Sequence, residues 1–251
     1  MKQAIRSLLA RGGYEIRKAR TVPAGSDTRP IGDLTSFLED IRARGFKIKC
    51  AADCGANHGN WSRALLDVYP HAQVVMVEAQ ESMRPHLQTV VDEFPEARIH
   101  IGGVGREKSE KLFTFWPDTT GSTFLEREDP KAQSEGRQVQ MPIDTLPAIL
   151  EKAGAPVPDL VKMDMQGFEL EALEGMAPIL PQVGALILES NTFAFLPGQP
   201  QANVLVTWLA HRGFFLYDIC GFGRRPTDGA LSHVDLVFAN DKGFLRRYQG
   251  W

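Results

Sequence analysis

Short apolar runs alternate with amphipathic segments along most of the chain. Seven such runs are separated by stretches in which apolar residues recur every three or four positions. Runs of this kind are typical of strands buried on both faces of a parallel sheet, and the stretches between them are typical of helices that pack on that sheet. The predicted strands comprise residues 48–53, 72–78, 97–102, 159–164, 183–189, 214–219 and 233–239.

The order of these elements predicts the architecture. Strands that alternate with helices favour a Rossmann-like α/β fold, here a seven-stranded, mostly parallel sheet with helices on both faces. The last two strands flank the turn GFGRRPTDG, where a hairpin would add one antiparallel strand. Residues 104–143 interrupt the alternation with two short strands around a polar loop. The predicted helices comprise residues 33–44, 61–69, 82–94, 144–153, 168–176 and 201–212.

The first 30 residues differ from the rest and are expected to form a basic N-terminal extension. Residues 1–20 carry six basic residues against the single Glu15, and Ile5, Leu8 and Leu9 share a helical face. Such a segment could rest on an anionic membrane surface, or it could be a short helix packed on the domain. We therefore divide the chain into the extension, residues 1–30, and one domain, residues 31–251.

Composition narrows the range of functions. A net charge of −3 on 251 residues opposes a broad nucleic-acid-binding surface. The chain has no apolar run near the ~20 residues that a membrane span requires. The cysteines, Cys50, Cys54 and Cys220, are odd in number and match no common zinc site, so we expect reduced thiols in a cytoplasmic protein.

The loop after the first predicted strand carries the first candidate site. It reads DCGANHG from Asp53 to Gly59, and its glycines allow a tight turn close to a ligand. Ligands of open α/β sheets bind at this position, beyond the carboxyl end of a strand. Asn57 stands where a dinucleotide fingerprint would need its second glycine. We assign Asp53, Gly55, Asn57 and Gly59 to a cofactor-binding loop.

Glu78 ends the second predicted strand, where a carboxylate can accept hydrogen bonds from a ribose. An acidic residue there without the phosphate fingerprint fits S-adenosylmethionine better than a nicotinamide dinucleotide. Val104, two residues beyond the third predicted strand, is assigned to the same cofactor site. The alternative for Glu78 is a surface charge at the end of a strand.

Asp164 and Glu189 end the fourth and fifth predicted strands and are the candidate catalytic residues. At the same edge of the sheet as Glu78, Asp164 could also contact the cofactor. Either carboxylate could take a proton from an acceptor hydroxyl, and the two together could hold Mg²⁺. The alternatives are a helix cap for Asp164 and a solvent-facing charge for Glu189.

These motifs resemble the FkbM family of S-adenosylmethionine-dependent methyltransferases over residues 48–240. ADCGANHGNWS is similar to the family's first-strand motif, and DLVKMDMQGFELEALEGM to its K-x-D-x-E/Q-G-x-E-x-x-x-L-x-G block. Many members have Glu at the position of Gln166. The resemblance implies a class I methyltransferase fold and O-methylation of sugars in glycoconjugates or of specialised metabolites.

Two other function classes remain open at this stage. A nucleotide-dependent oxidoreductase would share the fold, although the glycine spacing opposes it. A non-catalytic cofactor-binding scaffold would share the loop, although Glu78 and Asp164 oppose it. The acceptor, the oligomeric state and the need for Mg²⁺ are not predicted by the sequence.

Overall fold

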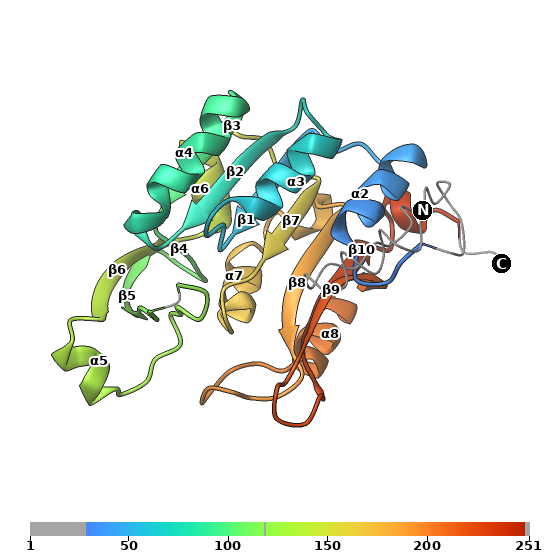
Figure 1. Ribbon diagram of the computed structural model, residues 1–251. Helices are drawn as coiled ribbons and strands as arrows, with labels where there is room; N and C mark the ends of the chain where they lie inside the picture. Colours follow the sequence, from blue (N-terminus) through green and yellow to red (C-terminus); the bar gives the residue numbers. More distant parts are fainter. Residues whose placement is uncertain (1–28, 118, 249–251) are drawn as a thin grey trace, which may run out of the picture.

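The computed structural model describes residues 29–117 and 119–248. Its main sheet has seven strands in the order β3-β2-β1-β7-β8-β10-β9, with β10 antiparallel to both of its neighbours and the other strands parallel to one another (Figure 1). The predicted mostly parallel sheet with one antiparallel strand is thereby confirmed. The strands are β1 (Cys50–Cys54), β2 (Gln73–Glu78), β3 (Ala97–Ile101), β7 (Leu160–Met163), β8 (Ala185–Asn191), β9 (Phe214–Arg224) and β10 (Leu231–Asn240).

Helices cover both faces of this sheet. One face packs against α2 (Leu34–Ala43), α3 (Asn60–Val68) and α4 (Arg84–Glu93). The opposite face packs against α6 (Leu146–Lys152), α7 (Glu169–Gly175) and α8 (Ala202–Ala210). Short 3-10 helices lie at Glu81–Met83, Leu180–Gln182 and Phe244–Arg246.

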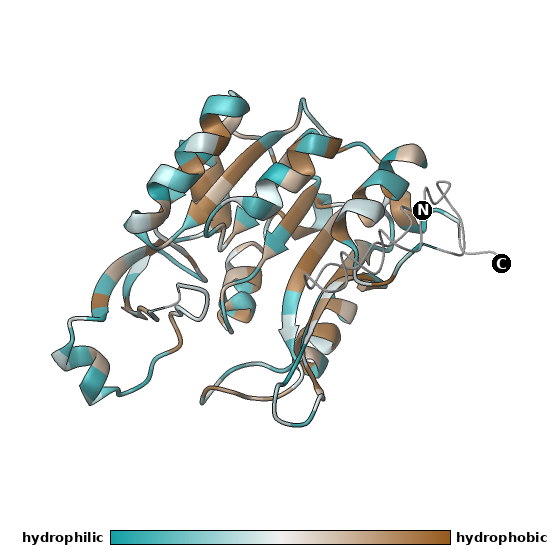
Figure 2. Cartoon of the chain, in the orientation of Figure 1, coloured by the Kyte–Doolittle hydropathy of each residue, from teal (hydrophilic) through white to brown (hydrophobic). Residues whose placement is uncertain are grey.

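The two hydrophobic clusters explain why the strands read as continuous apolar runs. One cluster of buried apolar side chains lies on each face of the sheet. All five residues of β1 are buried. Within this strand Ala51 belongs to one cluster and Ala52 to the other, because successive side chains point to opposite faces. Figure 2 shows hydrophobic residues along the central strands and hydrophilic residues on the outer sides of the helices. A strand covered on both faces needs apolar residues at every position.

Residues 103–144 form a second, smaller sheet beside the carboxyl ends of β2 and β3. Its order is β4 (Gly103–Val104), β6 (Gln138–Asp144) and β5 (Ser109–Thr114). The two short strands expected here are confirmed as β5 and β6. The sequence did not predict β4 or the short helix α5 (Pro130–Ser134) within the polar loop.

Helix starts follow local capping chemistry. Asp33 precedes α2, and its carboxylate accepts a hydrogen bond from the backbone N–H of Ser36, as the sequence predicted. Asp144 was expected to begin a helix, but it ends β6, and Thr145 caps α6 instead. The closing hairpin has a shorter turn than expected, because β9 continues to Arg224.

The basic extension, residues 1–30, falls almost entirely outside the described residues, so its contact with a membrane surface stays a prediction. Within residues 29–117 and 119–248, no helix has the length and apolar character needed to cross a bilayer. Cys50, Cys54 and Cys220 are buried free thiols, as expected.

Candidate active site

Two adjoining cavities lie at the carboxyl ends of β1, β2, β7 and β8. They have volumes of about 220 Å³ and about 250 Å³ and share four lining residues: Gly55, Asn57, Asp164 and Glu189. Each is smaller than the roughly 300 Å³ at which typical small-molecule sites begin, and together they fall within that range.

The loop between β1 and α3 forms the boundary between the cavities. Gly55 has φ +80°, and a Cβ atom on it would lie 1.9 Å from the carbonyl oxygen of Asp164. Only glycine allows the loop to pass this close to the end of β7. The ammonium of Lys162 donates a hydrogen bond to the carbonyl of Gly55 at 3.0 Å, which fixes the loop from below.

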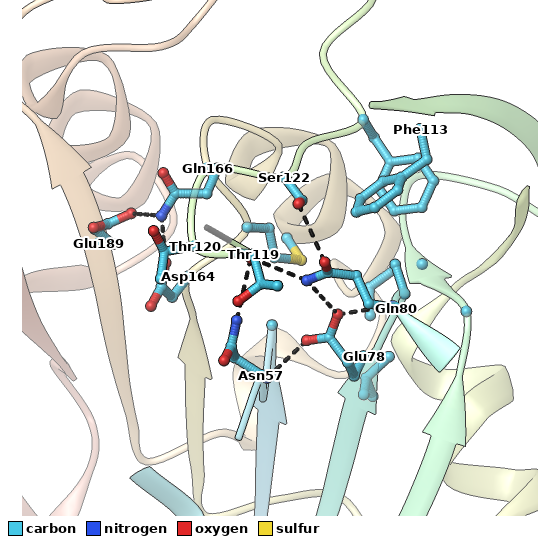
Figure 3. Close-up of a pocket in the computed structure, with 18 residues that line it drawn as sticks. Asn57, Glu78, Gln80, Phe113, Thr119, Thr120, Ser122, Asp164, Gln166 and Glu189 are labelled. Atoms are coloured by element: carbon cyan, nitrogen blue, oxygen red, sulfur yellow. Dashed lines mark hydrogen bonds between the residues drawn. The ribbon is translucent and has the colours of Figure 1, made fainter. Parts of the chain in front are cut away.

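Glu78 holds the same loop from the end of β2. Its Oε2 accepts the backbone N–H of Asn57 at 2.7 Å, and its Oε1 accepts the backbone N–H of Gln80 at 2.8 Å (Figure 3). The side chain is 5% exposed, and burial raises the pKa of Glu78 despite these bonds. Within the described part of the chain Oε2 accepts one hydrogen bond, which leaves a lone pair that a ligand hydroxyl can use.

Asp53 and Gly59 lie behind the loop and do not line the cavity beside Glu78. Asp53 is fully buried, accepts a hydrogen bond from Ser62 Oγ at 2.7 Å, and lies 3.4 Å from the Lys162 ammonium. Gly59 starts α3, where a Cβ atom would lie 2.9 Å from Val90 on α4. These two residues therefore shape the loop through packing and charge, and they do not contact the space that a ligand would fill.

The small sheet and the loop between its strands β5 and β6 build the outer wall. Val104, Phe113 and Phe124 are each at most 5% exposed and give this wall an apolar surface. The amide of Gln80 donates to the carbonyl of Thr119 at 3.0 Å and joins β2 to the loop. A ligand here would contact apolar groups on one side and the polar Glu78 network on the other.

The second half of the site is a group of charged residues at the ends of β7 and β8. Lys162 lies 3.2 Å from Asp164, whose side chain is 36% exposed, and 3.4 Å from Asp53. Burial opposes the charge on Lys162, but the two carboxylates outweigh burial and raise its pKa. Burial likewise opposes the charge on Asp164, yet the Lys162 ammonium prevails and lowers the pKa of that carboxyl.

Glu189 behaves in the opposite way. Its side chain is 12% exposed, and burial together with the charge of Asp164 raises the pKa of Glu189. Asp164 is therefore ionised at neutral pH while Glu189 holds a proton. The pair offers one carboxylate that can accept a proton and one carboxylic acid beside it.

The Mg²⁺ that the sequence left open finds no support in this arrangement. Among the described residues, no group of three or more His, Cys, Asp or Glu side chains is placed to hold a metal ion. The amide nitrogen of Gln166 also lies between the two carboxylates, 2.9 Å from Asp164 and 2.7 Å from Glu189. A hydrogen-bond donor occupies the place where a cation would need oxygen ligands.

The structure thus brings Gly55, Asn57, Glu78, Val104, Asp164 and Glu189 to one site and places Asp53 and Gly59 behind it. Sequence reasoning gave no role to Lys162, although it stands two residues before Asp164 in the same strand and therefore on the same side. It also missed Gln80, Phe113 and Phe124. The only local signal for Gln80 was a polar side chain two positions after Glu78. No local signal in the sequence pointed to the two phenylalanines.

A family model described as "Methyltransferase FkbM domain" matches residues 53–216. The chain belongs to the FkbM methyltransferase family. It is accordingly an S-adenosylmethionine-dependent methyltransferase, and its strand order is that of the class I methyltransferase fold expected from the sequence. The match begins at Asp53 and includes the glycine loop, Glu78, Asp164 and Glu189. No curated protein matches the sequence of this methyltransferase.

Several solved structures resemble the methyltransferase at low sequence identity. An uncharacterized protein from Listeria monocytogenes serotype 4b is 16% identical with a TM-score of 0.47, covering 86% of this chain and 70% of its own. The 1,6-didemethyltoxoflavin-N1-methyltransferase of Burkholderia thailandensis is 12% identical with a TM-score of 0.46, covering 95% and 86%. Precorrin-6y C5,15-methyltransferase from Geobacter metallireducens GS-15 is 12% identical with a TM-score of 0.45, covering 82% and 86%. The family assignment depends on the match over residues 53–216.

Proposed function

We propose that this enzyme is an O-methyltransferase whose acceptor is a sugar hydroxyl of a glycoconjugate or a hydroxyl of a specialised metabolite. The observation that carries the proposal is the partly exposed Asp164 carboxylate, ionised beside Lys162 at the boundary between the two cavities. A hydroxyl must lose its proton as it becomes an ether, and a positioned carboxylate can take that proton. The acceptor class follows from the resemblance to the FkbM family.

The residues of both cavities fit S-adenosylmethionine. We place the adenine against the apolar wall of Val104, Phe113 and Phe124, and one ribose hydroxyl on the free lone pair of Glu78 Oε2. The amino-acid end then crosses Gly55 into the second cavity, on the side of the Asp235 carboxyl group, which makes that part of the cavity acidic. An acidic cavity suits the α-ammonium group of a methionine.

When bound, S-adenosylmethionine supplies an already activated methyl group, so the protein contributes alignment and proton removal. Asp164 accepts the acceptor's hydroxyl proton as the new carbon–oxygen bond forms and the methyl–sulfur bond of the cofactor breaks, which leaves S-adenosylhomocysteine. The Lys162 ammonium keeps Asp164 ionised before the reaction. Because this same charge makes Asp164 a weak base, proximity must supply much of the rate enhancement.

The test uses S-adenosylmethionine with an isotope-labelled methyl group and three acceptor pools: extracted glycolipids, nucleotide-linked sugars and small hydroxylated metabolites. Mass spectrometry identifies the product and the methylated atom. Asp164→Asn should keep the affinity for S-adenosylhomocysteine and reduce turnover by about 10²-fold or more, the usual scale for loss of a positioned base.

Three results would contradict the proposal. The first is methylation of protein or nucleic acid alone. The second is a product methylated on nitrogen or carbon. The third is full turnover by a folded Asp164→Asn variant, which would leave that carboxylate a structural role. A nucleotide-dependent oxidoreductase or a non-catalytic scaffold would give no labelled product from any acceptor pool.

A further inference from the structure

The side-chain amide of Gln166 connects the two candidate catalytic carboxyl groups. Its Nε2 donates to Asp164 Oδ1 at 2.9 Å and to Glu189 Oε2 at 2.7 Å (Figure 3). Both hydrogens of one amide group are therefore used, one on each carboxyl group. A Gln166 side chain with its oxygen in that place would face the ionised Asp164 carboxylate, which only accepts hydrogen bonds, so Asp164 requires the donor orientation.

The backbone at Gln166 is held in a conformation that a long side chain rarely adopts. Its φ of +54° lies in the left-handed region, which costs on the order of 1 kcal/mol or more for a residue with a Cβ atom. The buried Glu169 Oε1 accepts the N–H of Met165 at 2.8 Å and that of Gly167 at 3.2 Å. Thr123 Oγ1 donates to the carbonyl of Gln166 at 2.9 Å.

These contacts fix the peptide group after Gln166 at both its N–H and its carbonyl, and they fix the peptide group between Asp164 and Met165 at its N–H. Such strain persists only where the surrounding structure enforces it, and it concentrates at functional sites. A residue that only capped the next helix would not need a left-handed backbone held by these contacts. The loop is built to direct one amide group at two carboxyl groups.

We infer that Gln166 is a positioning residue whose amide, and not a cation, holds the carboxyl groups of Asp164 and Glu189 together. This inference rests on the proposed function and adds how its proton acceptor is held. Gln166 itself takes no proton. It fixes the carboxylate oxygen of Asp164 relative to the acceptor and leaves the second oxygen beside Lys162.

The charged and titratable groups around the pair come from four elements. Lys162 on β7 and Asp53 on β1 lie on one side, and Glu169 on α7 lies beneath the loop. From β10, His233 approaches Glu189 at 4.0 Å, and Asp235 faces the same cavity. The hydrogen bonds from Glu189 and from Gln166 add to Lys162 in lowering the pKa of Asp164, so removal of the Gln166 bond should move the Asp164 titration to higher pH.

Carboxyl-carbon NMR on protein labelled at Asp and Glu tests this directly, with Asp164→Asn and Glu189→Gln used for assignment. Gln166→Leu should move the Asp164 midpoint upward by about one pH unit, while the exposed Gln140→Leu on β6 leaves it unchanged. Gln166→Asn, whose amide is too short to reach both groups, should behave like the Leu variant and serves if that variant does not fold. The titration needs neither cofactor nor acceptor, so its outcome is independent of the proposed function.

A second measurement separates an amide bridge from a metal site, with Mn²⁺ as the probe in electron paramagnetic resonance titrations. Wild type should bind no Mn²⁺ at the pair. Gln166→Glu places a third carboxylate there and should bind Mn²⁺ with a Kd at least about tenfold below the highest concentration at which wild type shows no binding, an effect that added Glu189→Gln removes. Three results would each overturn the inference. The first is an Asp164 titration midpoint that does not change in Gln166→Leu. The others are Mn²⁺ binding by wild type that Asp164→Asn abolishes, and a Gln166→Glu variant with no gain in Mn²⁺ affinity.

Discussion

Glu169 shows how a single buried carboxylate can support the site without touching a ligand. It is 1% exposed, and burial raises its pKa to about 7 although backbone N–H groups, including those of Met165 and Gly167, donate to it. In the unfolded chain a Glu titrates near pH 4.3, so the folded protein binds this proton more tightly. The contribution to stability is therefore fully present below the unfolded pKa and is lost as the pH rises through the folded pKa.

We expect Glu169→Gln to remove this pH dependence, because the amide oxygen can still accept both backbone hydrogen bonds but does not ionise. The free energy of unfolding of the wild type, from urea titrations at pH 5, 6, 7 and 8, should fall relative to the variant as the pH rises. Glu169→Leu leaves two backbone N–H groups unsatisfied and should lose about 1–3 kcal/mol or more at every pH. If the free energy of unfolding of Glu169→Gln varied with pH as that of the wild type does, the pH dependence would not come from Glu169.

At this scale the sequence predicted which residues end strands but not which way each side chain points. Asp53 and Glu78 look alike in sequence, since both are acidic and close a strand. Asp53 turns toward Lys162 and Ser62 within the domain, whereas Glu78 lines the cavity. Strand register decides between these outcomes, and a one-residue change in the predicted end of β1 reverses the face.

The small sheet and its loop are the elements that distinguish this site from a bare Rossmann-like crevice. Phe124 lies with its ring centroid 4.6 Å from that of Phe113 and 5.5 Å from that of Phe168. A Cβ atom on Gly103 would approach the same ring to 2.6 Å. The ring therefore fixes β4 against the loop and forms part of the cavity wall.

Phe124→Ala should destabilise the protein by about 3–5 kcal/mol, the usual cost of removing a buried ring, and should weaken binding of S-adenosylhomocysteine. Phe195→Ala is the matched control, because that ring is 49% exposed and its loss should change stability by no more than about 0.5 kcal/mol. Thermal unfolding and calorimetric titration measure both effects. Equal stability in the two variants would show that the wall does not depend on this ring.

Periodicity predicted the elements of the main sheet well because each buries a continuous apolar surface. It predicted the region of residues 103–144 poorly because β4 has only two residues and pairs with β6, which lies about 40 positions later. Strands that pair across so many residues leave no periodic pattern of apolar residues within a short stretch of sequence. The walls formed by Phe113 and Phe124 could not be assigned to the site for the same reason.

The whole molecule presents one composite site at the carboxyl edge of its sheet, with an acidic half and an apolar half. A dinucleotide needs a phosphate-binding loop, whereas Asn57 interrupts the glycine spacing here. A bound cofactor should stabilise the folded protein by a predictable amount. A ligand that binds only the folded state, at 100 times its Kd, stabilises that state by ~2.7 kcal/mol.

S-adenosylhomocysteine at that concentration should raise the Tm by roughly 5–10 °C for a protein of this size, and NADH should leave it unchanged. Differential scanning fluorimetry compares the two ligands in the same buffer. A shift with NADH and none with S-adenosylhomocysteine would favour a nucleotide-dependent oxidoreductase and reject the cofactor assigned to these cavities.

The most direct test of the cofactor site is calorimetric titration of S-adenosylhomocysteine into wild type, Glu78→Gln and Glu81→Gln. Glu81 is the matched control, because it is an exposed carboxylate three residues away that pairs with Arg84 on the surface. Glu78→Gln should weaken binding by about tenfold or more, consistent with about 1–3 kcal/mol for a buried acceptor, while Glu81→Gln binds as wild type does. Equal affinity in a folded Glu78→Gln variant, or no binding to the wild type, would contradict the account.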